Sequence, residues 1–363
     1  MTPIVPEAAP VPEVVPTPEA APTPDAAPIA GPPSSNTLLD VRDLRVTYRQ
    51  SGSPTSAVPA VRGVSFTLGR GDTLGVAGES GSGKSTMALS LLRLLGGSAK
   101  VEGQVLFAGE DLLTAKWSRL RAVRWSAASV VFQGAMSALN PVQTVVDQIV
   151  EPIVLHDKVG VKEAERRAAE LLDSVGIPSK RMRGYPHEFS GGQRQRVMIA
   201  MALACRPDLI IADEPTTALD VMVQAQILEL LAGLVRESQI AVIMISHDLS
   251  VLAHTCDRLA VMYAGEIVEL GRSRDVLDQP RHPYTKALSR AFPTIGDPAS
   301  RRRPEGLAGD PPRPSEIGAG CAFAPRCAEV TESCRTEPVM LWPAGVGRSA
   351  ACLLVRSEQG GAE

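Results

Sequence analysis

A phosphate-loop motif constrains this chain more than any other stretch. Residues 78–86 read Gly-Glu-Ser-Gly-Ser-Gly-Lys-Ser-Thr and fit the pattern Gly-x4-Gly-Lys-Ser/Thr. Its glycines permit a tight turn whose backbone N–H groups point inward, and the N-terminus of a following helix adds to the attraction for phosphate. An apolar run at 73–77 precedes the motif, and an apolar helical segment at 87–95 follows it. The sequence therefore predicts a strand, a phosphate-binding loop and a helix in that order, rather than a flexible Gly/Ser linker.

The side chains of the motif supply the remaining contacts with a nucleotide. Lys84 brings a positive charge to the outer phosphates, and the hydroxyl of Ser85 can ligate Mg2+. The residues expected to bind ATP in this loop are Gly78, Ser80, Gly81, Ser82, Gly83, Lys84, Ser85 and Thr86.

Composition indicates a globular protein with attached segments. The chain has 363 residues, enough for two or three domains, and 44% of them are hydrophobic. A net charge of -3 argues against nucleic acid as the main partner. No apolar run approaches the roughly 18 residues that cross a bilayer, and we see no secretory signal. We therefore expect a cytoplasmic location.

Residues 1–36 differ from the rest of the chain. They contain eleven prolines, four acidic side chains and no Lys or Arg. Such a composition cannot bury enough apolar surface to order itself. We interpret this stretch as a disordered acidic tail, for which a solvated tail and a partner-binding segment are both open.

Strand patterns surround the phosphate loop. Alternating apolar residues predict strands at 38–48, 61–68 and 103–109. Tyr48 ends the first of these, where its ring could stack on a purine base or simply be a strand tyrosine. A short strand at 128–132 leads to Gln133, whose carbonyl oxygen could ligate Mg2+ or the attacking water.

The middle of the chain has helical periodicity, from 137 to 205. Within 161–175 one face is apolar, with Ala164, Ala168, Leu171, Leu172 and Val175. At 190–193 the sequence Ser-Gly-Gly-Gln begins another helix. Its N–H groups could form a second phosphate site, although a serine there is often only a helix cap.

Two wholly apolar runs, 209–212 and 241–245, predict parallel strands covered on both faces. Asp213 and Glu214 follow the first strand; the aspartate can hold Mg2+ and the glutamate can deprotonate a water. His247 follows the second, where it could contact a terminal phosphate or be structural. A hairpin is expected at 258–263 and 266–270.

These motifs, in this order, resemble the ATP-binding subunit of an ABC transporter across residues 38–355. The matching segments are 78–85 (Walker A), Gln133 (Q-loop), 190–193 (signature), 209–214 (Walker B), 218–220 (D-loop, ending in Asp220) and His247 (switch histidine). Tyr48 matches the adenine-stacking aromatic of the family. The resemblance implies an α/β fold: an ABC-type P-loop ATPase core with a RecA-like parallel sheet and an antiparallel β subdomain, joined by a helical subdomain.

The family also implies a mechanism. Two such domains pair head to tail, so Ser190, Gly191, Gly192 and Gln193 would complete the ATP site of the partner. By resemblance Glu214 is the general base, His247 senses the terminal phosphate, and Gln133 couples the site to the transport channel. Mg2+ would be held through Ser85, Gln133 and Asp213.

Residues after 280 indicate the branch of the family. The segment 280–288, Pro-Arg-His-Pro-Tyr-Thr-Lys-Ala-Leu, and Leu-Asn-Pro at 139–141 resemble the oligopeptide and dipeptide importers. Gly134 and Ala135 depart from the acidic residue and proline that are usual after the glutamine. That departure bears on the contacts with the membrane subunit.

Four cysteines lie in a Gly/Pro-rich C-terminal stretch, and two more lie in the ATPase core. Two disulfides are not expected in a reducing cytoplasm, so converging thiolates suggest a metal site. The stretch resembles the four-cysteine module of peptide-importer ATPases, which implies a [4Fe-4S] cluster; zinc and no metal stay open. Ala328 stands where the family often has proline. The expected ligands are Cys321, Cys327, Cys334 and Cys352.

The predicted organisation is a tail at 1–36, an ABC ATPase domain at 37–280 with a helical subdomain at about 134–196, a peptide-importer-type extension at 281–356 and a flexible end at 357–363. The resemblance implies an ATPase that drives uptake of di- and oligopeptides at the cytoplasmic face of the membrane. Its expected partners are a second ABC ATPase subunit, related but different, two permeases and an extracytoplasmic binding protein. Import of nickel, haem or another small solute, a soluble non-transport ABC ATPase and a non-enzymatic regulatory module are the alternatives.

Overall fold

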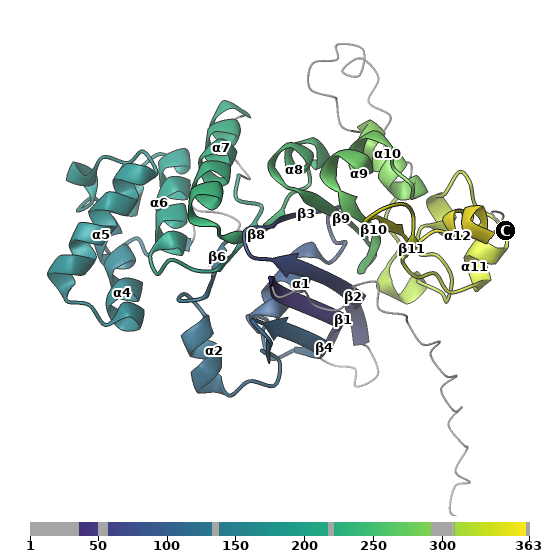
Figure 1. Ribbon diagram of the computed structural model, residues 1–363, viewed down its shortest axis with the longest axis horizontal. Helices are drawn as coiled ribbons and strands as arrows, with labels where there is room; N and C mark the ends of the chain where they lie inside the picture. Colours follow the sequence, from purple (N-terminus) through teal and green to yellow (C-terminus); the bar gives the residue numbers. More distant parts are fainter. Residues whose placement is uncertain are drawn as a thin grey trace, which may run out of the picture.

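The computed structural model describes residues 36–49, 57–132, 138–216, 221–291, 307 and 309–360. The acidic tail predicted at 1–36 lies outside these residues except for Asn36, as do Gln133 and Asp220. In Figure 1 the described chain forms a helical group, a central sheet with a second sheet beside it, and a C-terminal group.

A central sheet carries the strands that the apolar runs predict. Its order in the described chain is β11-β12-β10-β9-β3-β8-β7-β6. Five neighbouring strands are parallel: β6 (Ala128–Val131), β7 (Leu209–Asp213), β8 (Ala241–Ile245), β3 (Thr73–Ala77) and β9 (Arg258–Tyr263). Every residue of β7 and β8 is buried, as expected for strands covered on both faces.

Alternate residues of these strands enter two different cores. Ile210, Ala212 and Val242 pack with the helical side of the molecule, whereas Leu209 and Ile211 pack with the antiparallel sheet. The side-chain period of two along a strand produces this division. The central sheet is therefore the layer on which both cores of the molecule are built.

An antiparallel sheet covers one side of the core. Its order is β2-β1-β4-β5, formed by β1 (Thr37–Arg49), β2 (Ala57–Gly69), β4 (Ala99–Phe107) and β5 (Glu110–Asp111). Helix α1 (Lys84–Leu91) follows β3 and buries Met87, Ala88 and Leu91 in the same core as this sheet. A short helix, α2 (Trp117–Val123), precedes β6.

The helical subdomain contains α4 (Val145–Asp157), α5 (Val161–Ser174) and α6 (Gly191–Leu203), with two short turns of 3-10 helix at Ser179–Arg181 and Pro186–Glu188. The apolar face predicted for 161–175 is confirmed: Leu171 is partly buried, and its other four residues are fully buried in one core. Helix α6 continues to Leu203, beyond the boundary placed near 196.

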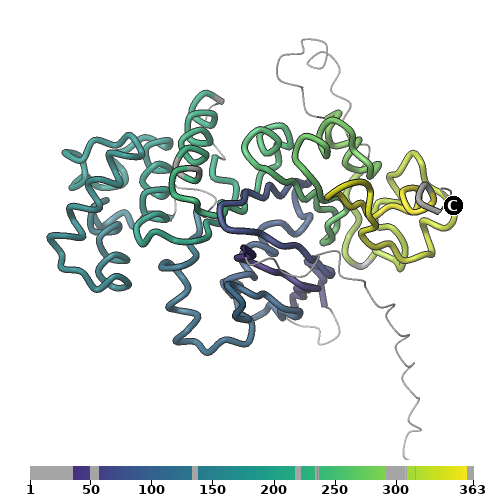
Figure 2. The backbone as a smooth tube through the Cα atoms, in the orientation of Figure 1, coloured from purple at the N-terminus to yellow at the C-terminus, as the bar shows by residue number. Residues whose placement is uncertain are grey.

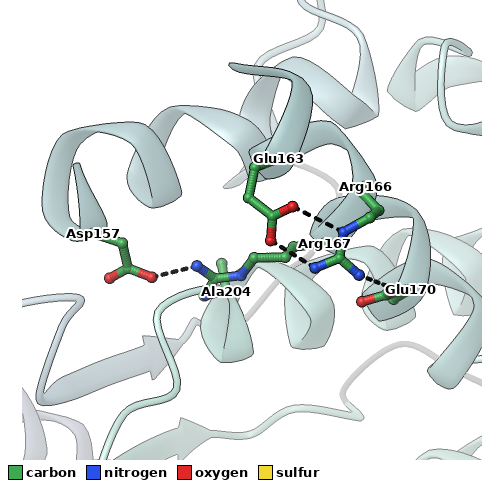
Figure 3. A network of polar contacts seen from close by, with 6 residues as sticks. All are labelled: Asp157, Glu163, Arg166, Arg167, Glu170 and Ala204. Carbon is green, nitrogen blue, oxygen red and sulfur yellow. Dashed lines mark hydrogen bonds and ion pairs between the residues drawn. The ribbon is translucent and has the colours of Figure 1, made fainter. Parts of the chain in front are cut away.

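Arg167 of α5 connects this helix to the C-terminal ends of α4 and α6 (Figure 3). One guanidinium nitrogen lies 2.6 Å from the Asp157 carboxylate at the end of α4, and another donates to the Ala204 carbonyl after α6 at 3.0 Å. Its side chain is 13% exposed. Arg166, its neighbour, bridges Glu163 and Glu170 on the surface of α5 and is 57% exposed. Of these two arginines, Arg167 is therefore the one that ties separate helices together.

The chain closes with the predicted hairpin and a docked extension. β9 pairs with β10 (Glu266–Arg272), and helices α7 (Val221–Ser238), α8 (Leu249–Thr255), α9 (Ser273–Asp278) and α10 (Pro283–Ala291) complete this side. The extension adds 3-10 turns at Pro314–Glu316 and Ala324–Arg326, then α11 (Ser333–Thr336), β11 (Trp342–Pro343), β12 (Ser349–Ala350) and α12 (Leu353–Gly360). Figure 2 shows the yellow C-terminal segment beside this green hairpin.

A buried ion pair holds the extension to the central sheet. β12 pairs with β10 next to Glu269, which is 0% exposed. The Glu269 carboxylate accepts from Arg348 at 2.5 Å and from the backbone N–H groups of Arg281 and His282. Strands β11 and β12 of the extension are thus an added edge of the central sheet rather than a separate tail.

Candidate functional site

The phosphate loop needs glycine at two positions where the backbone passes close to neighbouring strands. Gly78 has φ 152° and Gly83 has φ 97°, a region that L side chains rarely adopt. A Cβ at Gly78 would lie 2.3 Å from the Met262 carbonyl oxygen, and one at Gly83 would lie 2.4 Å from the Ala60 carbonyl oxygen. The loop is therefore fixed between β9 and β2, immediately before α1.

Lys84 lies under this loop with its ammonium held by backbone carbonyls. Its Nζ donates to the carbonyl oxygens of Gly78 and Glu79, both at 2.8 Å. Only 6% of the residue is exposed, and this burial lowers the pKa of Lys84, against the charges of Glu214, Asp213 and Glu79. The ammonium is therefore positioned inside the loop that would surround a phosphate.

Ser85 and Asp213, two of the predicted Mg2+ ligands, lie together. The Ser85 hydroxyl donates to a carboxylate oxygen of Asp213 at 3.0 Å. Asp213 ends β7 and is 5% exposed, and burial raises its pKa while the Ser85 hydrogen bond opposes the rise. Adjacent hydroxyl and carboxylate oxygens are the donors that Mg2+ prefers. These two residues fit the ion, whereas Gln133 lies outside the described residues.

Glu214 and His247 follow neighbouring strands at the same edge of the sheet. Asp213 pairs with Ile245 in register, and the Glu214 N–H donates to the Ile245 carbonyl at 3.0 Å. The Ser246 N–H donates to the Val76 carbonyl at 3.3 Å, which joins the same edge to the strand before the phosphate loop. Glu214 is half-buried and His247 is exposed. The carboxyl ends of β3, β7 and β8 therefore present the loop, the carboxylates and the histidine together.

Ser190 begins α6 as a helix cap. Its hydroxyl accepts from the Gln193 N–H at 3.4 Å, while the Gln193 side chain accepts from the Ser190 N–H at 3.1 Å. Gly191 starts the helix, and a Cβ at Gly192 would lie 2.6 Å from a methyl carbon of Val223 on α7. Both the cap and Gly192 are needed locally, so a phosphate-binding role would use N–H groups that the cap leaves exposed.

The signature lies apart from the phosphate loop of its own chain. Helix α6 packs against α4, α5, α7 and β6, whereas α1 packs against β1, β2, β7 and β8. Figure 1 shows α6 in the helical group, to the left of the central sheet, and α1 nearer the antiparallel strands. The structure does not bring the segment 190–193 to the loop at 78–86 within one chain.

Tyr48 lies near the end of β1, opposite Val58 and Ala99 in the sheet. Its side chain is half-buried and packs against the core shared with α1. Part of the ring therefore has a structural role, and the remainder is accessible to solvent. Stacking on adenine stays a prediction.

Two contacts with the loop were missed by reasoning from the sequence. The N–H of Glu79, the second residue of the motif, donates to the Tyr284 hydroxyl at 3.0 Å. The Glu79 carboxylate receives both guanidinium nitrogens of Arg326, at 2.7 and 3.0 Å. Tyr284 belongs to the His-Pro-Tyr-Thr segment, which signals the family in sequence but gives no indication of this contact.

The four C-terminal cysteines line one small pocket, together with His282 and Phe323. The pocket is about 10 Å³ in volume. Burial and the neighbouring thiols both act to raise the pKa of Cys321 there. Burial raises the pKa of Cys321 to about 11, and it also raises the pKa values of Cys327 and Cys352. Within the described ranges, however, no three His, Cys, Asp or Glu side chains are arranged to hold a single metal ion. The thiols converge without forming a one-ion site.

His282 lies against this pocket as a neutral side chain. Burial lowers its pKa to about 4, and its Nδ1 accepts the N–H of Tyr284 at 3.0 Å. Glu329 also lines the pocket, and its charge is a further cause of the raised pKa values of Cys327 and Cys352. Arg326, which directly precedes Cys327, is engaged by Glu79.

Two family models match this chain. The model described as ABC transporter matches residues 61–217, and the model described as oligopeptide/dipeptide transporter, C-terminal region, matches residues 268–334. The first contains the phosphate loop, the signature and Glu214, and the second contains Tyr284, Arg326 and three of the four pocket cysteines.

Curated relatives are similar across nearly their whole length. The oligopeptide transport ATP-binding protein OppD of Salmonella typhimurium is 46% identical over 88% of this chain and 95% of its own. OppD of Escherichia coli is 46% identical over 84% and 89%. A putative peptide import ATP-binding protein of Brucella abortus is 48% identical over 87% and 94%.

A solved structure shares the fold. The ATP-binding cassette MJ0796, in a dimeric post-hydrolysis state bound to ADP and Pi, matches with a TM-score of 0.59 and 28% identity, over 65% of this chain and 99% of its own. The ABC-type core predicted from the motifs is thereby confirmed. Because relatives of 46–48% identity align almost end to end and both family models match in order, this chain belongs to the ATP-binding subunits of the oligopeptide/dipeptide branch of ABC transporters.

Proposed function

We propose that this chain hydrolyses ATP to energise the uptake of di- and oligopeptides across the cytoplasmic membrane. The observation that supports this most is that the described ATP-site groups and the peptide-transporter C-terminal region are in direct contact within one chain. The phosphate loop, Asp213, Glu214 and His247 meet at one sheet edge. The His-Pro-Tyr-Thr segment lies directly against that loop.

The chemistry follows from the groups at this edge. The loop N–H groups and Lys84 would bind the phosphates, while Ser85 and Asp213 would hold Mg2+. The ion neutralises phosphate charge when bound. Glu214, which directly follows β7, would take the proton of the attacking water, and His247 would contact the terminal phosphate.

A second subunit would complete the site. The segment 190–193 is remote from the loop of its own chain, so we infer that it serves the ATP of a partner in a head-to-tail pair. The helix N-terminus of α6 has the polarity to attract that phosphate charge. Closure of the pair on ATP and release after hydrolysis would then drive the transport cycle. We propose a related but different ATPase chain as the partner.

Permeases and a binding protein would be the other partners. In the described ranges, no helix has the length and apolar character to cross a bilayer. We therefore propose a peripheral position at the cytoplasmic face, held by two permease subunits, with peptide delivered from outside by a binding protein. Phe132 and Val142 are exposed. They lie on either side of residues 133–137, which include Gln133, the residue predicted to couple the ATP site to the transport channel.

Membrane fractionation tests this assignment. The chain should sediment with membranes when the two permeases of its own transporter are co-expressed, and it should stay in the supernatant when they are absent. An unrelated permease pair is the matched control. If the chain remained fully in the supernatant with its own permeases present, a transport role would be contradicted and a non-transport ATPase would be favoured.

We also propose that the four-cysteine pocket holds a [4Fe-4S] cluster. Thiolate sulfur is the ligand of both zinc and iron–sulfur clusters. The four thiols line one pocket of the described residues, which supports a shared group of either kind. A cluster is larger and binds each thiolate at a different iron. Cys321, Cys327, Cys334 and Cys352 would be its ligands.

Anaerobic isolation tests the cluster. The protein should be brown, contain iron and sulfide, and lose both in the variant Cys334→Ser. The matched control is Cys256→Ser, which changes a buried cysteine of the ATPase core and should keep the colour. A colourless preparation with one zinc per chain, lost in Cys334→Ser, would replace the cluster by zinc.

A further inference from the structure

Glu79 is held by three separate groups. Its carbonyl accepts from Lys84 at 2.8 Å, its N–H donates to the Tyr284 hydroxyl at 3.0 Å, and its carboxylate pairs with Arg326. The Arg326 side chain is only 6% exposed, and the two-point geometry is the strong form of such a pair. Lys84 belongs to the phosphate site, but Tyr284 and Arg326 belong to the C-terminal region. The second residue of the loop is therefore positioned from outside the ATPase motifs.

The same two residues border the cysteine pocket. Arg326 directly precedes Cys327 in the chain, and Tyr284 donates its N–H to His282, which lines the pocket. Phe323, another lining residue, packs at right angles on Tyr263 with ring centroids 5.3 Å apart, and lies 5.4 Å from the Tyr284 ring. Close-packed side chains have low compressibility, so a displacement at one of them is transmitted to its neighbours. The pocket and the loop consequently share one rigid contact.

A nucleotide must alter this contact. Lys84 now donates to the Gly78 and Glu79 carbonyls, and its ammonium would have to turn toward the outer phosphates when ATP binds. The hydrogen bond from Glu79 to Tyr284 and the ion pair between Glu79 and Arg326 would then fix the position of the start of the loop. A loop that is already positioned loses less freedom on binding.

We propose that Tyr284 and Arg326 are positioning residues for the phosphate loop, and that through Glu79 they couple ATP binding to the state of the four-cysteine pocket. The inference rests on the proposed ATP site but not on peptide import, nor on which metal the thiols hold. Because coupling between two sites is reciprocal in binding free energy, a state of the pocket that changes ATP affinity must itself be favoured or disfavoured by ATP.

Nucleotide binding is the first measurement. In the full chain carrying Glu214→Gln, the added change Tyr284→Phe should weaken MgATP binding about 3- to 10-fold, because the Glu79 N–H loses its acceptor while the ring packing remains. Glu79→Gln, which removes the charge but not the backbone contact, should weaken binding similarly. Tyr185→Phe, at an exposed tyrosine of the helical subdomain, is the matched control and should bind as the parent does.

Thiol alkylation is the second measurement, and a purely structural role of Tyr284 would not produce its result. In the anaerobically isolated protein, with a chelator present to take up metal that the thiols release, MgATP should slow alkylation of Cys321, Cys327, Cys334 and Cys352 severalfold, as followed by mass spectrometry. Cys205 and Cys256, buried in the ATPase core, are internal controls, and their alkylation rates should not change with MgATP. In Tyr284→Phe the effect of MgATP on the pocket should disappear.

The outcomes separate the two parts of the inference. Unchanged MgATP affinity in both Tyr284→Phe and Glu79→Gln would overturn the positioning role. Weakened affinity with thiol rates indifferent to MgATP would overturn the coupling. Neither result depends on permeases, so a failure of the import assignment in the fractionation experiment would leave this test intact.

Discussion

Glu214→Gln should bind MgATP with nearly the parent affinity and lose at least about 100-fold in hydrolysis, the usual contribution of a general base. The carboxamide keeps the shape of the side chain after β7 but cannot accept the proton of the attacking water. The loop, Lys84 and the Ser85–Asp213 pair, which would hold the nucleotide, are left unchanged. Equilibrium nucleotide binding and phosphate release, measured on the complete transporter, separate the two effects.

The matched control for that variant is Glu170→Gln. Glu170 lies on α5, is 63% exposed and pairs with Arg166 on the surface (Figure 3). It should hydrolyse ATP at the parent rate. Hydrolysis by Glu214→Gln at a normal rate would remove the catalytic assignment while leaving the nucleotide-binding loop in place.

Arg348→Met should produce the largest loss of stability, about 3–5 kcal/mol in the free energy of unfolding, because it leaves a buried carboxylate without its counter-charge. Glu269 is 0% exposed and Arg348 is 8% exposed, so water cannot replace the lost partner. The effect should be concentrated where β12 docks on β10. Thermal unfolding, together with limited proteolysis of the segment 341–360, would measure it.

Two companions make this prediction specific. Arg335→Met changes an exposed arginine of the same extension and should cost less than about 1 kcal/mol. The double variant Glu269→Gln with Arg348→Met should recover much of the loss, because it leaves no unpaired buried charge. A loss below about 1 kcal/mol in Arg348→Met would show that the extension is held by other contacts.

Local patterns predicted the parts of the site that the chain carries within single segments. The motif at 78–86, the apolar strands before Asp213 and His247, and the amphipathic face at 161–175 each contain enough periodicity or turn chemistry to specify their own structure. Because parallel strands end at one edge, the meeting of Glu214 with the phosphate loop followed from the strands alone.

Contacts between distant segments could not be predicted in this way. Arg326 and Glu79 are separated by 247 positions, and nothing in either local pattern indicates that they pair. Glu269 reads as an ordinary residue of a hairpin, although it is the buried anchor of Arg348. Short strands such as β11 and β12 have two residues each, too few to show a period. The tertiary fold alone decides these partners.

The cysteines illustrate both situations. Their number and their Gly/Pro-rich surroundings predicted that the thiols converge, and they do line one pocket. The distances between the sulfurs depend on how the turn at Ala324–Arg326 and helix α11 pack, which spacing in the sequence does not determine. Chemical analysis of the isolated protein decides between one ion and a larger cluster.

Uptake of a labelled peptide into vesicles is the most direct test of the central claim. This chain would be reconstituted with its ATPase partner, both permeases and the binding protein, and supplied with MgATP on the side that faces the ATPase subunits. We predict peptide accumulation that requires ATP, stops with Glu214→Gln and persists with Glu170→Gln. Equal accumulation with wild-type and Glu214→Gln subunits, or ATP hydrolysis without any peptide movement, would contradict the account.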